Sequence, residues 1–204
     1  METNNKSILY TTVLIDEMDP KYLFKKYSEN WWGWQFGLQY KDFIMQSSRI
    51  RVEYTWMDHR VYRNKIVLND YYHYGYPLGF WGGPHSEELY IDFSLKLQNL
   101  DIFLSYSNAK RGELTDQMIL NAYDSIYYRR YSGIVEQKQI LSITALKDIP
   151  ANIKFLVGID VIDWVNGGFE PYNGNTIETS KLQTISKLSL SLGLYYNFTN
   201  SKIR

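Results

Sequence analysis

The chain has 204 residues, 22 basic and 22 acidic side chains, no cysteine, and an aromatic content of 17%. Zero net charge gives no electrostatic basis for nucleic-acid binding, and the absence of cysteine excludes disulfides and thiolate metal sites. No apolar run approaches the ~20 residues of a membrane helix. The length suits one domain over residues 1–204.

Eight segments alternate between apolar and polar side chains, the period expected of β-strands. Residues 32–41, for example, place Trp34, Phe36 and Leu38 on one face and Gln35 and Gln39 on the other. Such alternation over about ten residues is typical of strands that face lipid on one side and a wet lumen on the other. In chain order, the predicted strands span residues 7–16, 32–41, 49–57, 88–97, 100–107, 139–146, 153–163 and 188–198.

The connections between these segments alternate in length. Long connections span 17–31, 58–87, 108–138 and 164–186, and the intervening ones, 43–48, 98–99 and 147–152, are short. Outer-membrane barrels have long extracellular loops and short periplasmic turns. The pattern therefore predicts an all-β, antiparallel transmembrane β-barrel in the bacterial outer membrane, with about eight strands in this chain. A soluble β-sandwich is the alternative, because a solvated sheet face also accepts polar side chains.

The connection over residues 58–87 contains the candidate binding site, an aromatic cluster followed by Trp81. Sugars present apolar C–H faces and hydroxyl groups, so aromatic rings beside polar side chains suit them. A second cluster places Arg129 and Arg130 among tyrosines, where they could pair with an anionic polysaccharide or a phosphate. Packing within the loops, or an interfacial aromatic girdle, would explain the same residues. The predicted glycan-binding residues are Tyr71, Tyr72, His73, Tyr74, Tyr76, Trp81, Arg129 and Arg130.

Neither metal binding nor catalysis is expected. The spacing of His59, His73 and His85 fits no standard metal motif. Ser86 follows His85 directly, but sequence neighbours do not define a catalytic geometry. We therefore expect a protein that is not an enzyme and that uses no metal or cofactor.

Several segments resemble the Wzi-type capsule-assembly family of outer-membrane β-barrels. They are residues 69–79 (Asn-Asp-Tyr-Tyr-His-Tyr-Gly-Tyr-Pro-Leu-Gly), 82–84 (Gly-Gly-Pro), 87–89 (Glu-Glu-Leu), 14–17 (Leu-Ile-Asp-Glu), 34–40 (Trp-Gln-Phe-Gly-Leu-Gln-Tyr) and 51–55 (Arg-Val-Glu-Tyr-Thr). Family members are typically longer, so this chain is similar to their carboxy-terminal portion. The first residues lack the apolar core of a signal peptide, which fits either a mature protein or part of a larger barrel.

The resemblance implies a protein at the Gram-negative cell surface that attaches or assembles capsular polysaccharide or another exopolysaccharide. Its expected partners are outer-membrane lipid and surface polysaccharide, which it would bind noncovalently through extracellular loops. The alternative function is a passive pore or solute channel, because mixed charges such as Arg51, Glu53 and Asp160 could line a wet lumen.

Overall fold

The computed structural model describes most of the chain. The described residues are 6–23, 30–62, 72–73, 76–77, 79–114, 118, 130–131, 133–150, 152–167 and 182–196. Among them, no helix is long and apolar enough to cross a membrane.

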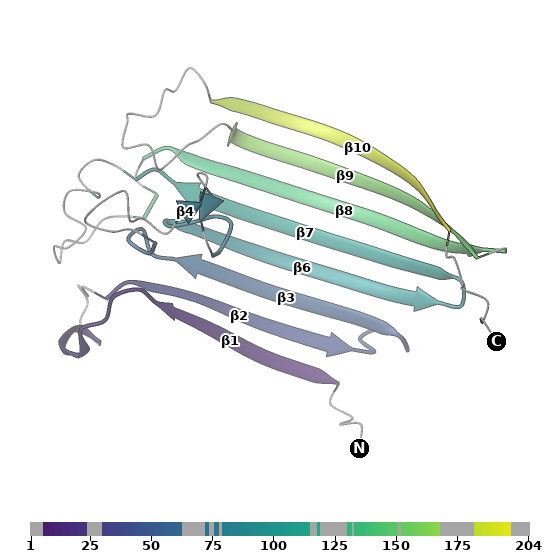
Figure 1. The fold of residues 1–204 in the computed structure, drawn as a ribbon, viewed down its shortest axis with the longest axis horizontal. Coiled ribbons are helices and arrows are strands. Elements are labelled where there is room, and N and C mark those ends of the chain that lie inside the picture. Colours follow the sequence, from purple (N-terminus) through teal and green to yellow (C-terminus); the bar gives the residue numbers. More distant parts are fainter. Residues whose placement is uncertain are drawn as a thin grey trace, which may run out of the picture.

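One antiparallel sheet of eight strands dominates the structure (Figure 1). Its strands follow one another in chain order, so each pairs only with its chain neighbours in the sheet. They are β1 (Ser7–Ile15), β2 (Trp32–Lys41), β3 (Ser48–Met57), β6 (Ser86–Leu97), β7 (Leu100–Gly112), β8 (Val135–Ile149), β9 (Ile153–Gly167) and β10 (Gln183–Tyr196). Two shorter elements and a 3-10 helix complete the described structure: β4 (Tyr72–His73), β5 (Tyr76–Pro77) and η1 (Pro20–Tyr22).

The predicted all-β, antiparallel fold of about eight strands is confirmed. In the described part of the chain, however, the sheet is open: β1 and β10 are its two edges and do not pair with each other (Figure 1).

Several predicted strands are too short. The alternation predicted an end at residue 107, whereas β7 continues to Gly112, and β8 begins at Val135 rather than residue 139. The extra residues are largely polar, yet the backbone ladder continues through pairs such as Arg111 with Glu136. Hydrogen-bonded pairing does not require apolar side chains, so hydrophobic alternation underestimates the strand length here.

The strand register gathers apolar side chains on one face of the sheet. A single row of cross-strand neighbours runs through Leu9, Leu38, Val52, Ile91, Tyr106, Leu141, Val161 and Leu188. The next row, on the opposite face, runs through Ile8, Gln39, Arg51, Asp92, Ser105, Ser142, Asp160 and Ser189. We call these two sides the apolar face and the polar face.

The apolar face is not covered by a second layer of the described residues. Leu9 is 80% exposed, and the four leucines of β10 at positions 188, 190, 192 and 194 are between 68% and 75% exposed. The whole chain exposes 14273 Å² of surface, whereas a compact monomer of 24.2 kDa exposes about 10,000 Å².

Buried packing within the described residues concentrates at one end of the sheet. Its core cluster is Trp31, Met57, Val61 and Tyr62, with Leu14 and Phe80 packed against it. These residues lie where the long connections join the strands, an end that we call the loop end. The sheet is thus one layer thick, with side-chain packing concentrated at the loop end.

Ion pairs cross the strands on the polar face. Asp92 in β6 accepts hydrogen bonds from both Arg49 and Arg51 in β3. Glu53 accepts a hydrogen bond from the Tyr10 hydroxyl of β1 and lies 3.6 Å from the Arg51 guanidinium. The polar face therefore neutralises these charges by pairing between neighbouring strands.

Candidate functional site

The structure describes few of the predicted glycan-binding residues. Tyr71, Tyr74 and Arg129 lie outside the described residues. The backbones of three others form a short hairpin, in which Tyr72 pairs with Pro77 and His73 with Tyr76. Of the predicted residues, only Trp81 and Arg130 have described side chains. Trp81 belongs to the predicted aromatic cluster of the connection 58–87, and Arg130 belongs to the predicted arginine–tyrosine cluster.

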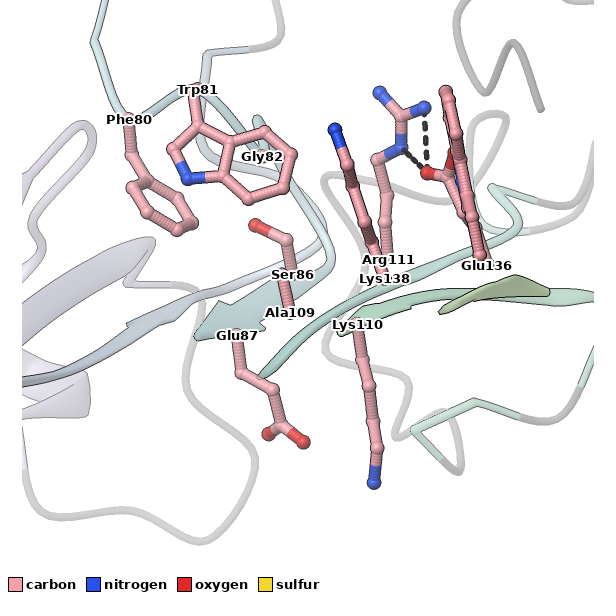
Figure 2. A pocket seen from close by; sticks show the side chains of 11 residues that line it. Phe80, Trp81, Gly82, Ser86, Glu87, Ala109, Lys110, Arg111, Glu136 and Lys138 are labelled. Atoms are coloured by element: carbon pink, nitrogen blue, oxygen red, sulfur yellow. Dashed lines mark hydrogen bonds and ion pairs between the residues drawn. The ribbon is translucent and has the colours of Figure 1, made fainter. Parts of the chain in front are cut away.

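Trp81 lines a cavity of about 140 Å³ at the loop end of the polar face (Figure 2). The register explains why a hollow forms there. Glu88, Ala109, Lys138 and Trp164 are consecutive cross-strand neighbours on β6, β7, β8 and β9. Because the small Ala109 stands between longer side chains, the space above it stays open.

Most residues that line this cavity lie on one side of the sheet, although Glu87 and Lys110 also line it. In Figure 2, Arg111, Glu136 and Lys138 stand on the same side of the strands as Trp81, whereas Glu87 and Lys110 point to the other side. This division follows the alternation of the strands. Lys110 and Lys138 therefore lie on neighbouring strands but on opposite faces.

Each indole in the cavity is fixed by a carboxylate. Trp81 Nε1 donates to Glu88 at 2.8 Å, and Glu88 in turn accepts from the Ser107 hydroxyl at 2.6 Å. Trp164 Nε1 donates to Glu136 at 2.8 Å. Arg111 donates from Nε to the other oxygen of Glu136 at 2.7 Å. The polar edges of both indoles are thus satisfied within the protein, and Trp81 is still 49% exposed.

Lys138 supplies the positive charge of the cavity. Its Nζ lies 4.7 Å from the centroid of the Trp164 ring, a cation–π contact. Among the described residues, no carboxylate forms an ion pair with Lys138, whereas Arg111 is paired with Glu136. Aromatic surface beside an ammonium group is suited to a ligand with an apolar C–H face and a negative charge. No group of three or more His, Asp or Glu side chains in the described segments could hold a metal ion.

Arg130 belongs to a second cluster, which joins the ends of two strands. Its terminal nitrogens donate to the carbonyl oxygens of Met57 at 3.0 Å and Ser86 at 2.7 Å. Its guanidinium also lies 4.8 Å from the Trp56 ring centroid and 4.7 Å from that of Tyr131. These contacts fasten the connection between β7 and β8 onto β3 and β6. A role of Arg130 in glycan contact stays a prediction.

His85 is the buried centre of the same cluster, only 2% exposed. Its Nδ1 lies 2.9 Å from the Glu113 carbonyl oxygen, and its Nε2 lies 3.3 Å from the Tyr131 amide nitrogen. A neutral imidazole that donates from Nδ1 and accepts at Nε2 satisfies both contacts. Burial, reinforced by the charge of Arg130, lowers the pKa of His85 to about 4.

Two neighbouring groups share this environment. Burial lowers the pKa of His59, whose ring centroid lies 6.2 Å from that of His85. Burial acts to raise the pKa of Asp58, but the hydrogen bonds from Arg60 and the nearby positive charges lower it overall. The cluster therefore favours neutral histidines beside an ionised aspartate at neutral pH.

The sequence did not identify Ala109, Lys138 or Trp164 as site residues. They lie on three strands that are far apart in sequence, and only the register brings them together. The one sequence feature that could have pointed to this site is the run of polar residues just before the predicted strand 139–146, because these residues interrupt the apolar pattern at the loop end.

Comparisons with protein-family models, with curated proteins and with solved structures found no match to this chain. The resemblance to the Wzi-type family therefore rests on the sequence segments that carry it.

Proposed function

We propose that this chain forms wall strands of an outer-membrane β-barrel that holds surface polysaccharide noncovalently at its loop end. The supporting observation is the unbroken apolar row across all eight strands, backed by a polar row on the opposite face. Soluble monomers rarely expose an apolar patch larger than a few hundred Å². Each leucine moved from water into lipid would contribute about 1.5–3 kcal/mol.

Aromatic side chains at both ends of the apolar face suit the two membrane interfaces. Near the loop end, the rings of Trp34 and Trp56 stack with centroids 5.8 Å apart. Near the opposite end, Tyr40 contacts Phe43, with centroids 6.3 Å apart. In the proposed orientation, the long connections face the cell exterior and the short turns face the periplasm.

The cavity between Trp81 and Trp164 is the proposed glycan contact. The indole faces would pack against a sugar ring, and Lys138 would pair with a carboxylate on that ring. The ligand is therefore proposed to be a polysaccharide that contains acidic sugars. The predicted residues Tyr71, Tyr72, His73, Tyr74, Tyr76 and Arg129 would extend this contact from the loops.

A titration with two oligosaccharides tests the binding proposal. Short oligogalacturonate, which is acidic, is expected to bind the detergent-solubilised protein more tightly than a neutral malto-oligosaccharide of equal length. Lys138→Ala should weaken oligogalacturonate binding by about 10-fold, the effect of losing one ion pair of about 1.4 kcal/mol. Lys110→Ala is the matched control and should leave the affinity unchanged, because Lys110 borders the cavity but its side chain points to the other face. Equal loss in both variants, or no binding of either sugar, would contradict the proposal.

A passive pore is the second candidate, supported by the charged and hydroxyl side chains of the polar row. Current across a planar bilayer distinguishes the two functions. A steady open-pore current that is insensitive to oligogalacturonate would favour the pore. An occluded barrel that still binds the acidic sugar would favour polysaccharide attachment.

A further inference from the structure

We propose that the membrane meets the sheet obliquely, so that polar side chains at the loop end of β7, β8 and β9 contact the lipid headgroups of the outer leaflet. The inference rests on the proposed membrane location and adds the tilt of the strands in the bilayer. It starts from the apolar face, where the apolar side chains do not occupy the same cross-strand rows on every strand. The register measures how far they are displaced from strand to strand.

The apolar runs of β2 and β9 show the full displacement. On β2, the apolar side chains of this face are those at alternate positions from 32 to 40, with Phe36 in the middle. On β9, they are those at alternate positions from 153 to 161, with Val157 in the middle. The cross-strand row of Phe36, however, reaches β9 at Asp163. The middle of the run is therefore displaced by six residues, from position 163 to position 157, toward the short turns.

The strands between β2 and β9 show the same displacement in stages. At the loop end, the apolar run ends with Trp56 on β3, Leu89 on β6 and Tyr106 on β7. Trp56 pairs with Glu87, two residues before Leu89, and Leu89 pairs with Asn108, two residues beyond Tyr106. Each run thus ends one row further from the loop end than the run before it. The apolar side chains form a straight band that crosses the sheet at an angle.

Both the slope and the width of this band fit a bilayer. Six residues of about 3.4 Å over five strand spacings of about 4.8 Å correspond to an angle of about 40°, and strands of outer-membrane barrels are tilted by about 35–45°. The nine residues of each run measure about 31 Å along the strand, or about 23 Å along the membrane normal at this tilt. The apolar band of such barrels is about 25 Å tall. Because one bilayer explains both values, we assign lipid to this face.

Polar side chains stand above the band on the same face of the sheet. Gln139 shares the row of Phe36 but lies four strand spacings away, so the tilt places it about 12 Å nearer to the cell exterior. This height corresponds to the edge of the hydrocarbon, half of the band of about 25 Å. The polar side chains at or above it are Lys110, Gln137, Gln139 and Asp163, which we call the outer polar patch.

The chemistry of the outer polar patch suits lipid headgroups. Lys110 points away from the cavity, to the apolar side of the strands (Figure 2), and its ammonium group can pair with a lipid phosphate. The side-chain amide of Gln137 donates to Asn108 at 3.0 Å, and Asp163 accepts from the Ser186 hydroxyl at 2.6 Å. These groups would be costly in hydrocarbon, whereas the headgroup layer solvates them.

The depth of spin labels in the bilayer tests the oblique position. Because the chain contains no cysteine, each single-cysteine variant carries one nitroxide in vesicles of phosphatidylcholine and phosphatidylglycerol. Collisions with oxygen, which concentrates in hydrocarbon, and with a water-soluble nickel chelate give the depth of the nitroxide. Phe36→Cys and Gln139→Cys form the main pair, since they share one row. Val157→Cys is the control, since it lies in the middle of the run on β9.

The labels at positions 36 and 157 are expected at the same depth, near the middle of the bilayer, and the label at position 139 about 12 Å nearer to the headgroups. Equal depths at positions 36 and 139, with position 157 about 20 Å away, would show that the rows lie parallel to the membrane. That result would overturn the inference and leave the membrane location intact. If the nickel chelate reaches all three labels freely, the sheet does not enter hydrocarbon, and the proposed function fails as well.

A second pair keeps the test decisive if a variant of the first pair does not fold. Leu38 and Leu141 share one row, four strand spacings apart, and are similarly exposed, at 46% and 44%. Labels on Leu38→Cys and Leu141→Cys are again expected to differ in depth by about 12 Å, with position 141 nearer to the headgroups. Equal depths of these two matched positions would overturn the inference.

Discussion

At the scale of single residues, the loop end depends on a histidine that the fold keeps neutral. His85 has a pKa of about 4 in the folded protein, compared with about 6.5 in an unfolded chain. Between these values the unfolded state binds a proton that the folded state does not, so stability falls as the pH drops. Acidification from pH 7 to pH 5 is expected to lower the free energy of unfolding by about 2 kcal/mol through His85. The lowered pKa of His59 acts in the same direction.

Urea unfolding of the inserted protein at pH 7 and pH 5 measures this loss. This range lies above the ordinary pKa of carboxylates, so histidines account for most of the change. His85→Gln should be less stable than the natural protein at pH 7 but should show a smaller difference between the two pH values. The same pH dependence in both proteins would show that His85 is not the responsible group.

At the scale of the strands, the two faces should respond oppositely to a charge. Val52→Arg, Phe93→Arg and Leu190→Arg each place a guanidinium on the apolar face, where lipid exposure should cost about 2–4 kcal/mol near the bilayer midplane. Gln39→Arg and Ser94→Arg place the same group on the polar face and should be tolerated better. The free energy of unfolding from lipid vesicles is the measurement. Similar losses in both sets would refute the membrane assignment of the apolar face.

The sequence was sufficient to predict which side chains share a face, but not where every strand ends. β2 matches its predicted bounds of 32–41, because its alternation persists to both ends. β7 extends past its predicted end, because backbone pairing continues where the side chains turn polar. β9 also extends past its predicted end, through Trp164 and Val165 to Gly167. The cavity could not be predicted from the sequence for a different reason. It depends on the relative register of β7, β8 and β9, which no single segment encodes.

At the scale of the whole molecule, the two ends of the sheet should lie on opposite sides of the outer membrane. Met18, in the long connection after β1, is 51% exposed, and Ile44, in the short connection after β2, is 68% exposed. In intact cells, a membrane-impermeant thiol reagent is expected to label Met18→Cys but not Ile44→Cys. Both variants should react after the outer membrane is disrupted. Labelling of Ile44→Cys alone in intact cells would reverse the proposed orientation, and equal labelling would contradict membrane insertion.

The chain-order pairing of the strands also bears on how such a protein could change in length during evolution. Because each strand of the sheet pairs only with its chain neighbours, losing two consecutive strands would leave a shorter sheet with the same alternation of directions. Losing one strand would instead reverse every later strand and move each following connection to the opposite end. Insertions and deletions in this architecture should therefore be inherited as whole hairpins.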